Sequence, residues 1–224
     1  MRDSIVPLAI LGGTFDPVHL GHLRAAWDAA EALDAEVRLI PANVPPHRPA
    51  PVASARQRAA MLRAALAGQD RLTLDTRELD RDGPSYTFDT LTSLRDEIGA
   101  RRPLVLLIGA DAFALLPTWH RWRELFDLAH IGVLTRPGHV PPLPDELSEA
   151  IASRETKDVQ ALRANAAGHV LRIAITPLEI SATKIRALLR EGREPRWLLP
   201  DALLADPELL ALYRQPDAVP RRQL

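Results

Sequence analysis

Cysteine does not occur among the 224 residues, which excludes disulfide bonds and thiol chemistry and fits a reducing compartment. No apolar run approaches the ~20 residues of a membrane span, and the first apolar run is too short for a signal peptide. The formal net charge is only −1, which argues against a nucleic-acid partner bound through bulk charge. We therefore expect a cytoplasmic protein that binds neither nucleic acid nor membrane, and in which any phosphate binding is local.

Proline, by contrast, is abundant, with 20 residues that cluster at 41–51, 137–144 and 195–220. Because proline interrupts helices and strands, these clusters indicate loops and a tail. With 46% apolar and 25% charged residues, the composition is that of a globular protein. The length suits one α/β domain, so we expect residues 1–224 to form a single domain in which 178–214 is a small C-terminal helical part.

Short apolar runs alternate with segments of helical periodicity along the chain. The runs predict strands at 6–11, 37–40, 72–76, 104–108, 130–134 and 170–175. The periodic segments predict helices at 23–33, 53–67, 88–98, 112–116, 118–126, 181–191 and 201–214, while 139–168 resembles a proline loop followed by a polar helical stretch. This alternation predicts an α/β fold with a doubly wound parallel sheet and a functional edge at the carboxyl ends of the strands.

Two groups of side chains in these helices are expected to serve structure rather than function. In the helix at 53–67 the apolar residues point inward, so Arg56, Arg58 and Arg63 should mostly form a solvated face. Trp27 falls on an apolar helical stripe and is expected to pack in the core, as are Trp122 and Trp197.

The stretch 12–22, GGTFDPVHLGH, follows the first expected strand and opens the first expected helix. Its two leading glycines allow a tight turn and a close approach of a ligand to the main chain. His19 and His22 are three residues apart with Gly21 removing bulk between them, so their rings can lie on the same side of the first helical turn. Because a helix start also presents free N–H groups, the stretch predicts a phosphate-binding site.

Other interpretations of this stretch stay open from the residues alone. A glycine pair after a strand is often a plain turn, and two histidines at this spacing could form half of a metal site, although no further ligand follows at a suitable spacing. Asp16 is ambiguous, because its carboxylate could orient His19 or help to hold a metal indirectly.

A second polar segment, ISATKIR at 180–186, opens a helix near the C-terminus. Ser181 or Thr183 can cap this helix, and Gly192 can end it. Hydroxyls, free amides and the guanidinium of Arg186 could hold a second phosphate group. The same residues also fit an ordinary capped helix, so this segment alone does not decide between the two.

Together the two segments resemble a known superfamily. HLGH at 19–22 is similar to the HxGH signature of the nucleotidyltransferases, and ISATKIR resembles their ISSTxIR motif, with Ala182 in place of the second serine. PPHR at 45–48, SYT at 85–87 and PTW at 117–119 resemble segments of the nicotinate-nucleotide adenylyltransferases. The resemblance covers roughly residues 8–213 and implies a Rossmann-like nucleotidyltransferase fold.

The resemblance also implies roles for the matching residues. His19, His22 and Arg186 are expected to be catalytic, because positioned donors stabilise the charge that develops on phosphoryl oxygens. The expected ATP contacts are Gly12, Gly13, Thr14, Phe15, His19, His22, His47, Arg48, Gly109, Asp111, Arg136, Ile180, Ser181, Thr183 and Arg186. The expected contacts of nicotinate mononucleotide are Gly13, Asp16, Asn43, Thr87, Phe88, Trp119 and His120. In that pocket Trp119 would stack on the pyridine ring, although it could instead anchor its own helix.

The implied reaction transfers the adenylyl group of ATP to nicotinate mononucleotide, giving nicotinate adenine dinucleotide and pyrophosphate in NAD biosynthesis. No covalent enzyme intermediate is expected. Mg²⁺ is the implied cofactor, held mainly by the ATP phosphates and not directly by the protein. The alternatives are an adenylyltransferase for nicotinamide mononucleotide or phosphopantetheine, and a sensor that binds ATP without turnover. Neither the oligomeric state nor the degree of preference for nicotinate follows from the sequence.

Overall fold

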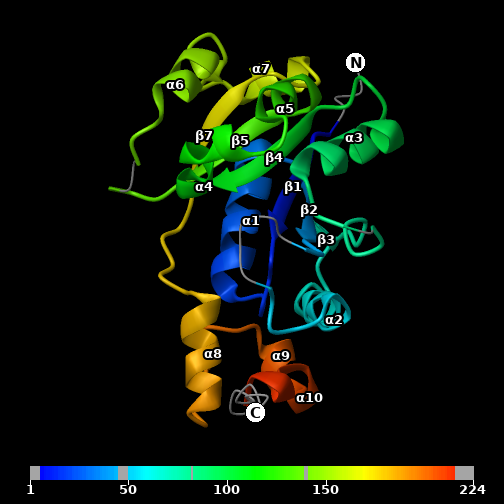
Figure 1. Ribbon diagram of the computed structural model, residues 1–224, viewed down its shortest axis with the longest axis vertical. Helices are drawn as coiled ribbons and strands as arrows, with labels where there is room; N and C mark the ends of the chain where they lie inside the picture. The colour runs from blue at the N-terminus through cyan, green and yellow to red at the C-terminus, as the bar shows by residue number, and fades with distance from the viewer. Residues whose placement is uncertain (1–5, 45–49, 82, 139–140, 215–224) are drawn as a thin grey trace, which may run out of the picture.

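A sheet of seven parallel strands forms the centre of the molecule (Figure 1). The computed structural model describes residues 6–44, 50–81, 83–138 and 141–214. The strands are β1 (Leu8–Gly13), β2 (Glu36–Pro41), β3 (Leu72–Leu74), β4 (Leu104–Gly109), β5 (His130–Thr135), β6 (Glu155–Thr156) and β7 (Val170–Ala174). Their order is β3-β2-β1-β4-β5-β7-β6, which confirms the predicted doubly wound parallel sheet.

Six of these strands lie where apolar runs predict them, and β6 does not. It consists of two polar residues that pair with the start of β7 at the sheet edge, within the stretch expected to be loop and helix. A polar two-residue edge strand has no periodic signal, so only the presence of its neighbour reveals it.

Helices and short 3₁₀ turns connect the strands. The helices are α1 (Leu20–Leu33), α2 (Ala55–Ala65), α3 (Thr87–Ile98), α4 (Ala110–Ala114), α5 (Leu125–Leu128), α6 (Asp145–Ile151), α7 (Val159–Ala164), α8 (Ala182–Arg190), α9 (Asp201–Ala205) and α10 (Pro207–Leu210). The 3₁₀ turns are η1 (Leu116–Thr118), η2 (Trp122–Glu124) and η3 (Ala211–Arg214). None of the helices within the described ranges is long and apolar enough to cross a membrane.

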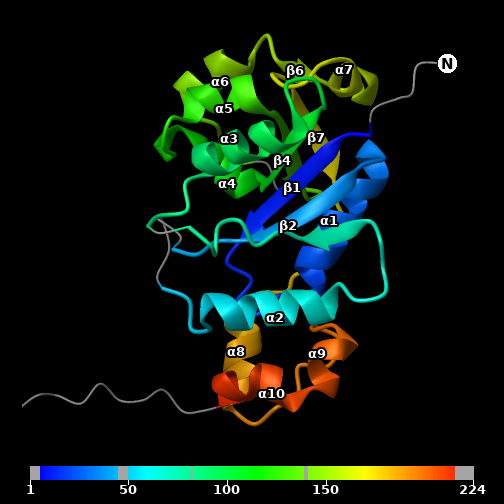
Figure 2. The ribbon, with the colours of Figure 1, turned by 90° about the vertical axis from the view of Figure 1, so that its right-hand side faces the viewer.

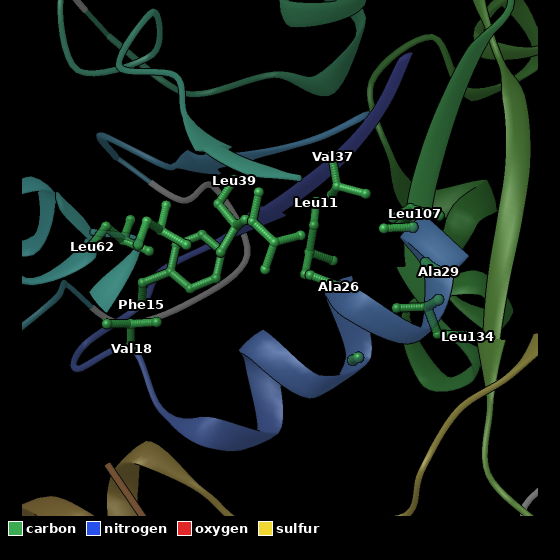
Figure 3. Close-up of a cluster of buried hydrophobic side chains, with 14 of the residues drawn as sticks. Leu11, Phe15, Val18, Ala26, Ala29, Val37, Leu39, Leu62, Leu107 and Leu134 are labelled. Carbon is green, nitrogen blue, oxygen red and sulfur yellow. The ribbon is translucent and has the colours of Figure 1, made fainter. Parts of the chain in front are cut away.

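The sheet carries a hydrophobic cluster on each face. On one face Val105 and Leu107 of β4 pack with α1, α2 and the C-terminal helices, and on the other face Leu104 and Leu106 pack with α3, α4, α5 and α6. An uninterrupted apolar strand such as β4 is therefore covered on both sides, as parallel sheets require. Figure 3 shows the first cluster beneath the turn that follows β1, where Phe15 and Val18 lie beside Leu62 of α2.

The order of the strands places the chemistry at one edge. β1 lies between β2 and β4, so the direction of winding reverses between β1 and β4. Ligands of open parallel sheets bind at such a reversal, beyond the carboxyl ends of the strands. Gly13 is paired with Pro41, and Gly109 with Leu134, so the turns after these four strands leave the sheet at the same edge.

The helices after β7 form a layer beneath α2, which lies between them and the sheet (Figure 2). The single helix predicted at 201–214 is wrong, because the chain breaks it into α9, α10 and η3. The break falls at Asp206, whose side chain caps α10, and Pro207 follows as the first residue of that helix. Leu203 and Leu210 still reach the core cluster, so the amphipathic pattern survives the break.

The tryptophans divide into three kinds. Trp122 is buried and Trp27 is half-buried against the core, as predicted. Trp197 is 74% exposed, so its predicted packing role is wrong. Its backbone is left-handed (φ 67°) in the turn that follows α8.

Candidate active site

The turn between β1 and α1 begins at Gly12 and Gly13, the last two residues of the strand. Neither has a left-handed backbone; the residue that does is Phe15, with φ 51°. A Cβ on Gly13 would lie 2.9 Å from the buried Phe15 ring, whereas a Cβ on Gly12 would meet no heavy atom within 4 Å. Gly13 therefore makes room for Phe15, and Gly12 leaves the main chain open to close approach by a ligand.

The two histidines of the turn lie together, as their spacing predicts. The His19 and His22 rings are stacked, with centroids 3.7 Å apart and planes 20° apart. The main-chain N–H of His19 donates to Nδ1 of His22 at 3.4 Å, and the His22 ring meets the Phe15 ring edge-on. A Cβ on Gly21 would lie 3.1 Å from Nδ1 of His19, so this glycine is needed for the arrangement.

His19 is the N-cap residue of α1 and is only 5% exposed. Burial, and to a smaller extent the positive charge of Arg136, together lower the pKa of His19 from 6.5 to about 4. Near pH 7 its imidazole is therefore neutral, so it donates one hydrogen bond instead of carrying a charge. Arg136 follows β5, and its influence on His19 links the ends of β1 and β5.

Asp16 is the meeting point of four segments. Its carboxylate accepts hydrogen bonds from the N–H groups of Val52 (2.8 Å) and Ala53 (3.0 Å) and from the hydroxyl of Tyr213 (2.6 Å). Its main-chain carbonyl accepts from Nη1 of Arg186 at 2.6 Å. Its carboxylate therefore ties the β1–α1 turn to the start of α2 and to η3, while its contact with the mononucleotide stays a prediction.

Tyr213 was not expected at this site. Its ring is 2% exposed, and burial together with the Asp16 carboxylate raises the pKa of the phenol, which remains protonated and donates to Asp16. The sequence gives no local signal for this contact, because 197 positions separate the two residues.

The ISATKIR segment lies against the same turn. Ser181 caps α8 by accepting from the N–H of Lys184 at 3.2 Å, and Nη2 of Arg186 reaches Oγ1 of Thr183 at 3.4 Å. Cβ of Ile180 lies 3.5 Å from the position of a Cβ on Gly21. The first and last motifs of the chain are therefore adjacent, with the Arg186 guanidinium placed by the Asp16 carbonyl.

Arg58 corrects an expectation, because it does not belong to a solvated face. It is 1% exposed and donates to the carbonyls of Thr14 (2.9 Å), Ala53 (3.2 Å) and Asn43 (3.4 Å). Burial lowers the pKa of this guanidinium, and the Asp16 charge opposes that effect. A signal was present, since Arg58 shares the apolar stripe of Met61 and Leu62 at spacings of three and four.

A second group of predicted residues lies at the start of α3. The helix begins at Thr87 with Tyr86 as N-cap residue, one position earlier than predicted, so the amides of Thr87 and Phe88 are among those without partners inside the helix. The His120 ring lies 4.6 Å from the Tyr86 ring and 6.4 Å from the Phe88 ring. The SYT and PTW segments therefore adjoin each other.

The remaining predicted residues have the following places. Trp119 is half-buried and packs on the second core cluster. Gly109 is the N-cap residue of α4, and the exposed Asp111 is the second residue of that helix. The side-chain amide of Asn43 donates to the carbonyl of Arg81 at 3.0 Å. His47 and Arg48 lie outside the described residues.

Two other features bear on what this site can hold. Within the described ranges, no three side chains of His, Cys, Asp or Glu are grouped so that they could hold a metal ion. A separate apolar groove is lined by residues of α1, by Ala65 and Leu66 at the end of α2, and by Gln69, Leu72 and Leu178. Its apolar lining does not suit a triphosphate, so we place no substrate in it.

Comparison with known proteins agrees with this geometry. The sequence model of the cytidylyltransferase-like family matches residues 10–188. A protein of Pseudomonas aeruginosa named "Probable nicotinate-nucleotide adenylyltransferase" is 52% identical over 211 residues, covering 93% of this chain and 98% of that protein. A protein of the same name from Pseudomonas syringae pv. tomato is 50% identical over 211 residues, covering 94% and 95%. The chain therefore belongs to the cytidylyltransferase-like family and, within it, to the nicotinate-nucleotide adenylyltransferases.

Solved structures agree on the fold. The nicotinic acid mononucleotide adenylyltransferase of Plasmodium falciparum, complexed with NaAD, matches with a TM-score of 0.66 at 15% identity. The match covers 91% of this chain and 97% of that chain. The predicted Rossmann-like nucleotidyltransferase fold is thus confirmed.

The state of His19 can be tested by NMR titration of the imidazole nitrogens. We expect His19 to titrate at about 4, and we expect Arg136→Ala to raise this pKa while leaving it below 6.5, because burial is the larger cause. Since the folded-state pKa is the lower one, this histidine's contribution to stability should be complete above about pH 6.5 and lost as the pH falls toward 4. Titration of His19 near 6.5 in the unaltered protein would contradict the buried, neutral imidazole.

Proposed function

We propose that this protein transfers the adenylyl group of ATP to nicotinate mononucleotide, giving nicotinate adenine dinucleotide and pyrophosphate. The observation that carries the proposal is the meeting of the two motifs, in which Arg186 is held by the Asp16 carbonyl beside the stacked His19 and His22 rings. The names of the close relatives support this acceptor, as does the NaAD complex of the structural neighbour. The cytoplasmic location expected from the absence of cysteine remains a prediction.

The chemistry is a single displacement at phosphorus. An oxygen of the mononucleotide phosphate attacks the α-phosphorus of ATP, a new P–O bond forms, and the bond from that phosphorus to the bridging oxygen breaks as pyrophosphate leaves. The protein needs to position the groups and to stabilise the growing charge on the phosphoryl oxygens. No nucleophilic side chain is required for this displacement.

His19 is suited to the central role in this displacement. Its Nδ1 is buried and has no hydrogen-bond partner within the described part of the chain. Because the ring is neutral, positive charge at the site comes from Arg186 and Arg136. His22 supports the His19 ring by stacking against it.

The acceptor side rests on the start of α3 and the PTW segment. The amides of Phe88 and His120 would hold the nicotinate carboxylate, and Trp119 would stack on the pyridinium ring. A carboxylate accepts charge-assisted hydrogen bonds from such amides that a carboxamide does not match. This contrast favours nicotinate mononucleotide over the nicotinamide alternative.

Mg²⁺ is the cofactor that we expect to enter with ATP. The Asp16 carboxylate is occupied by three hydrogen bonds, and the described residues offer no cluster of metal ligands. The described residues thus do not fit a protein-held ion, and we expect the nucleotide phosphates to hold it. We assign it no step.

A pyrophosphate-release assay with Mg-ATP and each candidate acceptor tests the proposal. We expect turnover with nicotinate mononucleotide, less with nicotinamide mononucleotide and none with phosphopantetheine.

His19→Ala should lower kcat by about 10²–10³, the effect of losing one donor to a developing oxyanion, with smaller changes in KM. Release of pyrophosphate with none of the acceptors would favour the ATP sensor, and near-normal turnover by His19→Ala would remove His19 from its role.

The stacking role of Trp119 is tested by Trp119→Ala. A cation over an indole face gains about 1–2 kcal/mol, so KM for nicotinate mononucleotide should rise by about 5- to 30-fold while KM for ATP changes little. Trp27→Ala is the matched control, since Trp27 is also half-buried but faces the apolar groove. Equal increases in both KM values, or the same change in the control, would show that Trp119 only packs on the second core cluster.

A further inference from the structure

Glu78 is a buried carboxyl group that the reaction described above does not use. It follows β3, in the segment that leads to α3, and is 7% exposed. Its Oε1 accepts a hydrogen bond from the hydroxyl of Thr90 at 2.7 Å, and its carboxylate also accepts from the side chain of Ser85. Burying a carboxyl group without hydrogen-bond partners is costly, so the two hydroxyl donors stabilise Glu78 in this position.

Ser85 carries this interaction to the loop after β2. Its Oγ accepts from the N–H of Asn43 at 2.9 Å, and its own N–H donates to the carbonyl of Val44 at 3.0 Å. The Ser85 hydroxyl can accept from Asn43 while it donates to Glu78, since a hydroxyl does both. The Ser85 hydroxyl therefore links the Glu78 carboxylate to the main chain of the loop that contains Asn43.

Thr90 carries the interaction to the first turn of α3. Its side chain is almost completely buried, and its N–H donates to the carbonyl of Tyr86, the N-cap residue, at 3.2 Å. Oγ1 of Thr90 also lies 3.3 Å from the same carbonyl. Because Glu78 is the acceptor for this hydroxyl, it anchors the first turn of α3, whose main-chain hydrogen bond from Thr90 in turn holds the Tyr86 carbonyl.

The amides of Thr87 and Phe88 follow directly from that N-cap. The Tyr86 ring lies 4.6 Å from the His120 ring, so a shift of the first turn of α3 also shifts its packing on the segment that carries Trp119. The two sides of the expected pyridine pocket, the start of α3 and the PTW segment, thus both depend on the position of the first turn of α3.

We infer that Glu78 is a positioning residue of the acceptor pocket, which acts through Ser85 and Thr90 to fix the amides at the start of α3. The inference rests on the proposed function, because it assigns this pocket to the mononucleotide. Glu78 touches no reacting atom, so its effect should appear in acceptor binding and in the preference for a carboxylate, and not in the binding of ATP.

Burial raises the pKa of Glu78, while the hydrogen bonds from Thr90 and Ser85 and the charge of Arg81 oppose that rise, and the charge of Asp75 adds to it. Nη1 of Arg81 also lies 3.4 Å from Oγ1 of Thr90. Replacement of the Glu78 carboxyl group by an apolar side chain would remove the acceptor of the short Thr90 hydrogen bond, and the Thr90 hydroxyl would keep only the longer contact with the Tyr86 carbonyl.

Thr90→Val is the direct test, and Thr92→Val is its control. Thr92 lies on the same helix, is half-buried and bonds only back to the carbonyl of Phe88 at 2.9 Å in the described structure, so the control removes a comparable hydroxyl that does not reach Glu78. In Thr90→Val we expect KM for nicotinate mononucleotide to rise at least fivefold and the preference over nicotinamide mononucleotide to fall. KM for ATP and kcat should change less than twofold, and Thr92→Val should change none of these values by more than twofold.

Conservative variants separate positioning from folding. Thr90→Ser keeps the hydroxyl and should restore KM for the mononucleotide to within twofold, and Ser85→Ala should reproduce the selective rise without altering α3. If Thr90→Val fails to fold, as judged by circular dichroism, these two variants decide the question. An equal rise in both KM values, or no difference between the Thr90 and Thr92 variants, would overturn the inference. Failure of the proposed function would show differently, as an unaltered protein that does not adenylate nicotinate mononucleotide.

Discussion

The buried carboxylate of Asp16 is the interaction on which the arrangement of this site depends. Two main-chain N–H groups at the start of α2 and the Tyr213 hydroxyl donate to it, and the adjoining carbonyl receives Arg186. Burying a carboxylate is costly unless donors replace water, and here three do so. The turn after β1 is therefore held from the side of α2 and from the side of the C-terminal helices at once.

This attachment explains how a neutral imidazole can serve a reaction of polyphosphates. Hydrogen bonding and charge come from different residues. Burial keeps the His19 imidazole uncharged, so that it acts as a hydrogen-bond donor in a fixed direction. Arg186 of α8 and Arg136 at the end of β5 supply the positive charge. Each charged group reaches the turn from a different element.

Much of the architecture could be predicted from the sequence. Short, mostly apolar segments located six strands, and the uninterrupted ones such as 104–108 are buried because a parallel sheet is covered on both faces. The adjacency of His19 and His22 followed from their spacing on a helical turn. The SYT and PTW segments were predicted to form one pocket, and the rings of Tyr86 and His120 are indeed neighbours.

The features that escaped prediction depend on contacts between distant parts of the chain. Nothing near Tyr213 indicates that its hydroxyl meets Asp16, and nothing near Glu78 indicates that Ser85 and Thr90 donate to it. Arg58 and the break at Asp206 are different, because an apolar stripe and a cap followed by proline were visible signals. They were outweighed by the general expectation that arginine is exposed and that a periodic segment is continuous.

A crystal structure with an α,β-methylene analogue of ATP and nicotinate mononucleotide tests the central claim most directly. The account predicts that the α-phosphate lies within hydrogen-bond distance of the His19 ring and the Arg186 guanidinium, above the turn held by Asp16. A triphosphate bound elsewhere, for example along the apolar groove between α1 and α2, with His19 and Arg186 contacting no phosphate, would contradict it.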